Sequence, residues 1–252
     1  MQRFIKNILV TTGKIFKSTS KNIVTTKDKK ANWVTQADLQ IEKYLINQIS
    51  KRFPNHFILS EETYPNLPKR LPEHIWIMDP LDGTTNATFG LPIYGTSIAY
   101  MHKGEILNGA IIDLSNSDLF YGQKGKRSFK NSKELIIKDR GIKGSLVCTG
   151  CPYTRNDFEK TESYFPKIHN SGARIIIIGS AVIASIYTTT NTFSIYYEFG
   201  LKPWDIAAAS LIVTGAGGQF YTEDNNQDIL KSNFYICGKP TAVQEFMNLY
   251  AS

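Results

Sequence analysis

A short apolar run at residues 75–78, Ile-Trp-Ile-Met, leads directly into Asp79-Pro80-Leu81-Asp82-Gly83-Thr84-Thr85-Asn86. An apolar run bounded by turn residues is typical of a buried strand. Pro80 has no backbone N–H to donate, so we expect the strand to stop there. Gly83 and Thr84 are then placed to begin a helix. This segment therefore predicts a strand, a turn and a helix in succession, with two carboxylates at the turn.

The two carboxylates suit a divalent cation. Mg²⁺ takes oxygen ligands in octahedral geometry, and two such ions about 4 Å apart can hold the attacking and leaving oxygens of a displacement. Asp79 can bridge two ions and Asp82 can flank them, with the Leu81 carbonyl as a further ligand. The backbone N–H groups of Gly83 and Thr84 can receive a phosphate at a helix start. The Thr84 hydroxyl can orient an attacking water.

Three further acidic residues can complete the same site. Glu61 and Glu62 follow a predicted strand at residues 57–59, and Asp205 opens a predicted helix. Each also has an ordinary explanation, because Asp-Pro and Asp-Gly are common turn dipeptides, and an aspartate in a first helical turn complements the helix dipole. Residue types alone leave both a metal site and unrelated surface acids open.

Periodicity predicts two helices near the N-terminus. Helical spacing of apolar residues favours an amphipathic first helix over a targeting segment, which leaves the cytoplasm as the default location. A second helix should begin after Thr35, because Thr35 and Asp38 match a capping box with Asp in place of Glu. The buried stripes are predicted at Ile5, Ile8, Leu9, Thr12 and Phe16, and at Ile41, Tyr44, Leu45, Gln48 and Ile49.

The rest of the chain alternates between strand and helix patterns, which predicts a mixed α/β protein of stacked sheet and helix layers. A hairpin is expected around residues 102–105, and helices are expected from 181, from 203 to about 215, and over 241–250. Strands are expected at 57–59, 75–78, 96–101, 106–112, 119–122, 135–138, 145–147, 175–178, 193–198, 219–222 and 234–237.

Bulk properties narrow the function classes. With 252 residues and 42% hydrophobic content the chain can bury a substantial core. No apolar run approaches the roughly 20 residues that span a membrane, so no membrane partner is expected. Cys148-Thr149-Gly150-Cys151 is a C-x-x-C, but Cys237 stands alone, so we interpret the pair as two structural thiols rather than as a redox or zinc site.

Part of the net charge of +7 lies in residues 124–133, which hold Lys124, Lys126, Arg127, Lys130 and Lys133. Nucleic-acid binding is one interpretation, but interleaved aromatic stacking residues are missing from this turn-rich hairpin. A solvated basic surface is favoured, and an anionic substrate would benefit from its field in either case.

Five segments together resemble the inositol monophosphatase family, in its order and roughly its spacing, over nearly the whole chain. They are residues 34–38, 60–62, 79–86, 179–181 and 198–208. The resemblance implies a layered α-β-α-β-α fold of the sugar phosphatase type, forming one unit over residues 1–252. Its lobes would be about 1–140, for metal and phosphate, and 141–252, on the substrate side. It also implies a homodimer and hydrolysis of a small phosphorylated polyol with two to three Mg²⁺ ions.

The resemblance also assigns roles. Glu61, Asp79 and the Leu81 carbonyl would hold the first ion, Asp79, Asp82 and Asp205 the second, and Glu61 with waters a third. Thr84, supported by Asp38 and near Glu61, would orient the nucleophilic water. Contacts to phosphate and polyol are implied for Asp82, Gly83, Thr84, Ser180, Ala181, Glu198 and Asp205.

Several positions depart from the family pattern. Asn32 replaces a common Asp in the loop at 27–32, which puts the third ion in question, and Ile176 stands where many members have Arg. Inositol 1-phosphate is the predicted substrate, with fructose 1,6-bisphosphate, histidinol phosphate and 3′-phosphoadenosine 5′-phosphate as alternatives. A regulator that binds RNA or a protein through residues 124–133 is the non-enzyme alternative.

Overall fold

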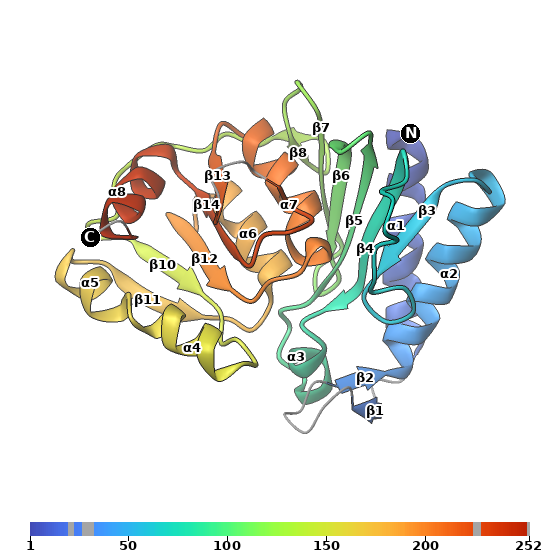
Figure 1. The fold of residues 1–252 in the computed structure, drawn as a ribbon, viewed down its shortest axis with the longest axis horizontal. Helices are drawn as coiled ribbons and strands as arrows, with labels where there is room; N and C mark the ends of the chain where they lie inside the picture. The colour runs from blue at the N-terminus through green and yellow to red at the C-terminus, as the bar shows by residue number, and fades with distance from the viewer. Residues whose placement is uncertain (20–22, 27–32, 224–227, 251–252) are drawn as a thin grey trace.

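The computed structural model describes residues 1–19, 23–26, 33–223 and 228–250. Within these ranges the larger sheet has seven strands in the order β3-β4-β5-β6-β7-β8-β9, with β3 and β4 parallel and each later neighbour antiparallel (Figure 1). Its strands are β3 Phe57–Ser60, β4 His74–Asp82, β5 Gly95–His102, β6 Glu105–Asp113, β7 Asp118–Gln123, β8 Phe129–Lys130 and β9 Lys133–Glu134.

The smaller sheet, in the described ranges, has five strands in the order β11-β10-β12-β14-β13. β10 pairs in parallel with β11 and β12, whereas β14 is antiparallel to β12 and β13. The strands are β10 Leu146–Thr149, β11 Arg174–Ile177, β12 Ile195–Phe199, β13 Gln219–Thr222 and β14 Phe234–Gly238. A separate antiparallel pair is formed by β1 Ile23–Thr26 and β2 Trp33–Thr35.

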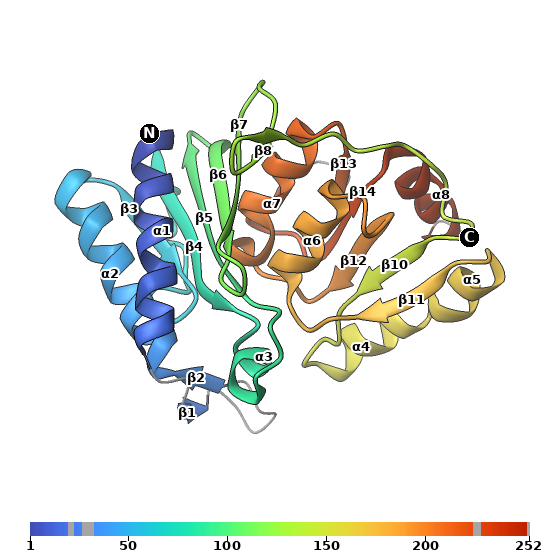
Figure 2. The same ribbon diagram turned by 180° about the vertical axis from the view of Figure 1, so that it is seen from behind.

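Helices fill the layers around and between the sheets (Figures 1 and 2). On β4, Trp76 and Met78 pack with α1 and α2, while Ile75 and Ile77 share a core with α6 and α7. The strand is buried on both faces, which explains its unbroken apolar run. The helices are α1 Gln2–Ser18, α2 Gln36–Arg52, α3 Thr84–Phe89, α4 Arg155–Glu162, α5 Phe165–Asn170, α6 Ala181–Thr189, α7 Pro203–Gly215 and α8 Pro240–Tyr250.

The far face of the smaller sheet packs against the C-terminal helix. Val147, Ile195 and Ile236 lie in one core with Phe246 of α8, and with Ile168 of α5. The order of layers is therefore α1/α2, seven-stranded sheet, α6/α7, five-stranded sheet, and α4/α5/α8 (Figure 2). This confirms the predicted α-β-α-β-α architecture.

Both N-terminal helices follow the predicted periodicity. All five residues of the α1 stripe are buried, and the Thr35–Asp38 capping box is formed. On α2, Ile41, Leu45 and Ile49 are buried, but Tyr44 and Gln48 are only half-buried. None of the helices in the described ranges is long and apolar enough to cross a membrane.

Two strand predictions were wrong. β4 does not stop at Pro80 but continues to Asp82. Residues 135–138 form no strand; the strand in this region is β9. Ile137 donates its backbone N–H instead to the Ala216 carbonyl after α7, at 2.9 Å. Helices α4 and α5 and the pair β1/β2 were not predicted, since their segments carry few periodic apolar residues.

Candidate active site

A bulge at the end of β4 explains why the strand passes through Pro80. Asp79 lies opposite Ser97 and Asp82 lies opposite Gly95, so two residues of β4 face one residue of β5. A missing N–H is tolerated at a bulge because the ladder is already interrupted there. The Leu81 N–H donates to Asp79 Oδ1 at 3.0 Å. The bulge therefore fixes both aspartates at the end of the sheet.

Asp205 joins these two residues from a different part of the chain. It lies in the first turn of α7, where its carboxylate accepts the Lys202 N–H at 2.6 Å. One carboxylate oxygen from each of Asp79, Asp82 and Asp205 lies within 4.8 Å of the others. Among the described residues, this is the group of acidic, His or Cys side chains that converges closely enough to hold a metal ion. Its all-oxygen ligand set fits a hard divalent cation.

The electrostatics of the group point the same way. Burial raises the pKa of Asp79 and of Asp205 well above the usual range, and the charge of Glu61 raises both further. Burial also raises the pKa of Asp82 to about 6, although hydrogen bonds from Ser180 and Val182 oppose the shift. None of the described ion pairs involves these three aspartates. A bound cation would favour their charged forms.

Glu61 lies close to this group without belonging to it. It occupies the turn that follows β3, and the three-aspartate group forms without it. Its charge nevertheless raises the pKa of Asp38 as well as that of the three aspartates. Glu61 is therefore close enough for its charge to act on the three aspartates and on Asp38.

Thr84 and Asp38 meet as predicted. Thr84, the first residue of α3, has its hydroxyl 2.9 Å from Asp38 Oδ1 and 2.8 Å from the Leu81 carbonyl. The other oxygen of Asp38 accepts the Thr35 N–H at 2.9 Å. The Thr84 hydroxyl has one proton, so donating it to either acceptor leaves an oxygen lone pair that can accept a hydrogen bond from water.

Gly83 is required at the start of α3. Its φ is 82°, a left-handed conformation that favours glycine, and a Cβ there would lie 2.6 Å from the Ile93 carbonyl. The glycine thus lets the chain turn from β4 into α3 within a single residue. α3 itself is six residues long.

Asp82 connects β4 of the larger sheet to the start of α6. Its Oδ2 accepts hydrogen bonds from the Ser180 hydroxyl and, at 3.0 Å, from the Val182 N–H. Ser180 is the N-cap of α6, and Ala181 is the first residue of that helix. The predicted residues Ser180 and Ala181 are therefore placed against the aspartate group.

Glu198 is a buried residue of β12, and its carboxylate accepts a hydrogen bond from the Tyr196 hydroxyl. Burial raises its pKa to about 7. Gly150 lies directly against this carboxylate, and a Cβ at that position would overlap it. The glycine of the Cys-x-x-Cys segment therefore makes room for Glu198.

Two residues in this region were given no site role in the sequence interpretation. Asn86 of α3 donates from Nδ2 to the carbonyls of Ile93 and Ile178, both at 2.8 Å, and so ties α3 to the chain entering α6. Glu42 of α2 is buried behind the turn that carries Glu61. A buried carboxylate beside Ile41 was not expected, because helical periodicity predicts burial from apolar residues and Glu42 is charged.

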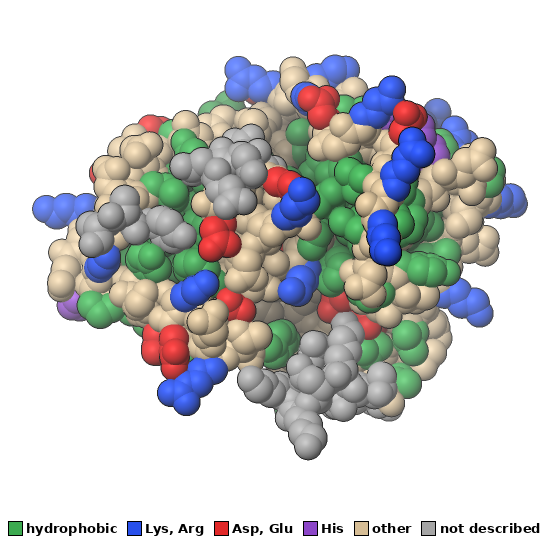
Figure 3. All heavy atoms as spheres, viewed as in Figure 1, with side chains coloured by type: hydrophobic (Ala, Val, Ile, Leu, Met, Phe, Trp, Pro, Cys, Tyr) green, Lys and Arg blue, Asp and Glu red, His purple; other side chains and the backbone are tan. Residues whose placement is uncertain are grey.

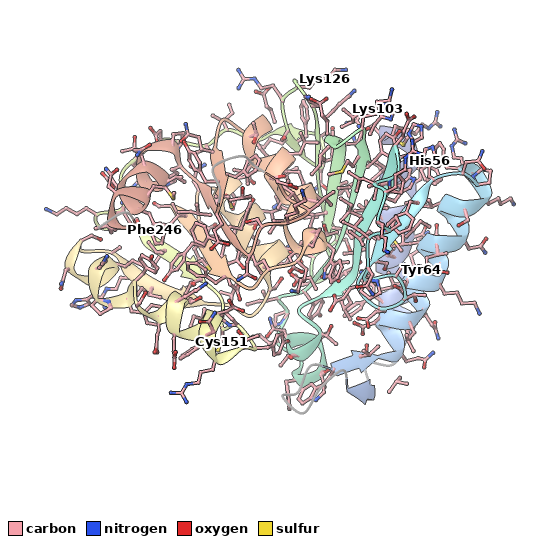
Figure 4. The ribbon with its side chains drawn as sticks, in the orientation of Figure 1. His56, Tyr64, Lys103, Lys126, Cys151 and Phe246 are labelled. Carbon is pink, nitrogen blue, oxygen red and sulfur yellow. The ribbon has the colours of Figure 1, made fainter. Side chains whose placement is uncertain are left out.

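The remaining predicted features lie elsewhere. Asn32 falls outside the described residues. Cys148 is buried, Cys151 is exposed and both are free thiols; Figure 4 shows Cys151 at the end of β10, on the side nearer α4. The basic segment 124–133 runs from the end of β7 through β8 to the first residue of β9. Figure 4 labels Lys126 of this segment at the edge of the molecule opposite Cys151.

Comparison with solved structures defines the class of protein. The structure described as extragenic suppressor protein suhB from Bartonella henselae matches with a TM-score of 0.82 and 27% identity, covering 95% of this chain and 94% of that one. The inositol monophosphatase (IMPase) of Thermotoga maritima matches with a TM-score of 0.84 and 24% identity, covering 99% and 96%. The fold is thus the one found in inositol monophosphatases.

Sequence comparison then identifies the family. The model described as "Inositol monophosphatase family" matches residues 4–251, so the chain belongs to the inositol monophosphatase family. Similar proteins include the Nus factor SuhB of Pseudomonas aeruginosa, 28% identical over 231 residues that cover 89% of this chain and 85% of that protein. Another is inositol monophosphatase 2 of Rattus norvegicus, 30% identical over 207 residues, covering 79% and 71%. The resemblance found in the sequence is confirmed.

Proposed function

We propose that the protein is a Mg²⁺-dependent phosphomonoesterase that hydrolyses a small polyol phosphate, with inositol 1-phosphate as the expected substrate. One observation carries this proposal: oxygens of Asp79, Asp82 and Asp205, from two distant elements, lie within 4.8 Å of one another. Family membership supports a phosphatase, and the Thr84–Asp38 pair beside the aspartates supports a positioned water.

Each acidic residue has a proposed ligand role. Glu61, Asp79 and the Leu81 carbonyl would hold the first ion, and Asp79, Asp82 and Asp205 the second. Glu61 would also contribute to a third. The ions would neutralise the phosphate oxygens and lower the pKa of the attacking water. The Leu81 carbonyl has a lone pair to spare beside its contact with Thr84, since a carbonyl oxygen carries two.

The protein's own groups would orient the reaction. With its proton directed toward Asp38, the Thr84 oxygen can accept a hydrogen bond from the attacking water and so aim it at phosphorus. The backbone N–H groups of Gly83 and Thr84 would bind the phosphate. Holding water and ester in one geometry removes much of the entropic cost of bringing them together.

The substrate side would be formed by the second lobe. Ala181 and Glu198 would contact the polyol, while Ser180 would act through its bond to Asp82. The pKa of about 7 means that the Glu198 carboxyl group can accept or donate a hydrogen bond near neutral pH. A homodimer and a cytoplasmic location complete the proposal.

A second candidate function is regulatory binding of RNA or a protein through residues 124–133. The Nus factor names of relatives such as those of Pseudomonas aeruginosa and Haemophilus influenzae favour keeping it. Three of the five basic residues already pair with acids: Lys124 with Glu105 at 2.6 Å, Lys130 with Asp118 at 2.6 Å and Arg127 with Glu134 at 3.6 Å. This pairing favours the phosphatase as the primary function.

A phosphate-release panel with and without Mg²⁺ tests the proposal. The substrates are inositol 1-phosphate, fructose 1,6-bisphosphate, histidinol phosphate and 3′-phosphoadenosine 5′-phosphate. We expect Mg²⁺-dependent turnover, fastest on inositol 1-phosphate, and its loss in Asp82→Asn with an unchanged circular dichroism spectrum. Hydrolysis of the adenosine bisphosphate alone would replace the polyol assignment, and full turnover by Asp82→Asn would contradict the metal assignment.

A further inference from the structure

Glu42 is a carboxylate buried inside the helix–sheet interface. It lies on α2 with only 2% of the residue exposed, between the apolar positions Ile41 and Leu45. A charged group at such a position is costly unless hydrogen bonds replace its water. The structure shows that three donors do so, and all three come from one short turn.

The donors lie on the two sides of Glu61. Oε1 of Glu42 accepts the Ser60 hydroxyl and, at 3.0 Å, the Thr63 N–H, while Oε2 accepts the Thr63 hydroxyl. Hydrogen bonds from neutral donors to an ionised carboxylate are stronger than those between neutral groups. The Glu42 carboxylate therefore binds the turn on both sides of Glu61, at Ser60 and at Thr63.

The backbone closes the same turn. Ser60 and Tyr64 exchange hydrogen bonds, from Ser60 N–H to the Tyr64 carbonyl at 3.1 Å and from Tyr64 N–H to the Ser60 carbonyl at 3.2 Å. Figure 4 labels Tyr64 on the side of the molecule that holds α2. Only three residues, 61–63, lie between the paired ends, with the Glu42 carboxylate bonded at their base.

Electrostatic repulsion between the glutamates of the turn and the aspartates would displace the turn if nothing held it. The charges of Glu61 and Glu62 both act on Asp79, in the direction that disfavours a second negative charge. A free turn would relieve this repulsion by moving its glutamates away from the aspartates. A turn anchored to α2 lacks that freedom, because its anchor lies on a helix packed in the core.

We propose that Glu42 is a positioning residue that holds the turn 60–64 so that Glu61 faces the Asp79, Asp82 and Asp205 group in a geometry suited to a divalent cation. This inference rests on the metal-ligand role proposed for Glu61. Groups that orient ligands are known to affect metal affinity by 10- to 100-fold when they are altered.

The test measures Mg²⁺ binding by isothermal titration calorimetry without any substrate. Glu42→Gln keeps the size of the side chain but replaces one acceptor oxygen with an amide donor. We expect about tenfold weaker Mg²⁺ binding. Ile41→Val, at the adjacent buried position of α2, is the matched control: it removes a core methyl group and should leave Mg²⁺ affinity within about twofold.

A double-mutant cycle separates positioning from general loss of structure. If Glu42 acts through Glu61, then Glu42→Gln should change Mg²⁺ affinity by less than about twofold once Glu61→Gln is present. Equal weakening in both backgrounds, or the same weakening from Ile41→Val, would overturn the positioning role. Because Asp keeps both carboxylate acceptor oxygens and Gln keeps only one, Glu42→Asp should bind Mg²⁺ better than Glu42→Gln.

The outcomes also distinguish this inference from the proposed function. A wild-type protein that binds Mg²⁺ in a Glu42-dependent way but hydrolyses no phosphate ester would remove the phosphatase and retain the positioning role. Unchanged Mg²⁺ affinity in Glu42→Gln, together with normal hydrolysis by the wild type, would remove the positioning role alone.

Discussion

The two concentrations of charge in this protein lie at opposite ends of α7. Asp205 is in the first turn of the helix, with Asp79 and Asp82 beside it. The last residue of the helix, Gly215, accepts the Ser128 N–H at 3.1 Å, within the basic segment 124–133. A helix of 13 residues is about 20 Å long at 1.5 Å per residue.

The two regions differ in how their charges are placed. The acids come from separate parts of the chain, are buried or half-buried, and have raised pKa values. The bases lie within one ten-residue segment and are exposed or half-buried, and most pair with acids on neighbouring strands. Figure 3 shows Lys and Arg side chains near Asp and Glu along the upper edge of the molecule. We therefore place the proposed site at the buried, converging acids rather than at the exposed bases.

Replacing Asp79 should have the largest effect. Asp79→Asn removes the carboxylate proposed to bridge both ions, so we expect kcat/KM to fall by roughly a thousandfold or more, or about 4 kcal/mol of transition-state stabilisation. Initial rates over a range of Mg²⁺ concentrations measure it. A loss that excess Mg²⁺ fully restores would show that Asp79 contributes affinity alone, which would weaken its bridging assignment.

Replacing Thr84 should reduce activity by less than replacing Asp79 does. Thr84→Ala removes the hydroxyl that Asp38 orients at 2.9 Å, and we expect kcat to fall by about a hundredfold. Thr84→Ser keeps the hydroxyl and should retain most of the activity. Both variants should bind Mg²⁺ like the wild type in calorimetry. Equal loss of activity in the two variants would show that the methyl group, rather than the hydroxyl, is what the site needs.

How far the sequence predicted this site depends on the kind of feature. Periodicity and the capping box correctly predicted α1 and α2, because both are local patterns. The resemblance indicated that Asp205 lies near Asp79, which no local pattern can show. Glu42 was missed, since the donors that make its burial tolerable come from a turn about 20 residues later in the chain.

The strand through Pro80 was missed for a similar reason. Proline within a strand argues for a stop, and only the pairing with β5 shows that Pro80 falls in a bulge. The predicted strand at 135–138 failed because apolar residues there pack beneath α7 without a strand partner: Leu135 and Ile137 are buried in the core that contains α7. In both cases tertiary contacts decided the local structure.

A group of three histidines offers a test of how burial and neighbouring titratable groups affect stability as the pH changes. His56, His74 and His102 stack at the end of the larger sheet, with ring centroids 4.3 and 4.6 Å apart, and Figure 4 labels His56 and the nearby Lys103. His56 Nδ1 accepts the Trp76 Nε1–H at 3.1 Å, and its protonation would break this bond. Burial lowers the pKa of His56, and its histidine neighbours lower it further.

The direction of the pH effect follows from that shift. Because the folded-state pKa of His56 lies below its unfolded value, the unfolded chain binds more protons near that pH. The free energy of unfolding should therefore fall as the pH drops below about 6.5. Urea midpoints at pH 8 and pH 5.5 measure the effect, and His56→Gln should reduce the difference between them. Lys103, paired with Glu73 at 3.8 Å, and the Tyr100 hydroxyl on His74 are the other groups nearby. An unchanged pH difference in His56→Gln would assign the effect to other groups.

Reversing charges in the basic segment should have the smallest effect on catalysis. Lys126 and Lys133 are exposed, and neither takes part in the described ion pairs. The segment lies about 20 Å from the aspartates, which is twice the Debye length of about 10 Å at 0.1 M salt. We expect the double variant Lys126→Glu/Lys133→Glu to keep kcat/KM within about twofold at that ionic strength, with a larger change only at low salt, where steering of an anionic substrate is stronger. A large loss of kcat/KM at 0.1 M salt would show that the basic segment contributes to catalysis, contrary to the distinction drawn between the acidic and basic regions. Salt-dependent RNA binding by the wild type that disappears in the double variant would instead give the basic segment a function of its own.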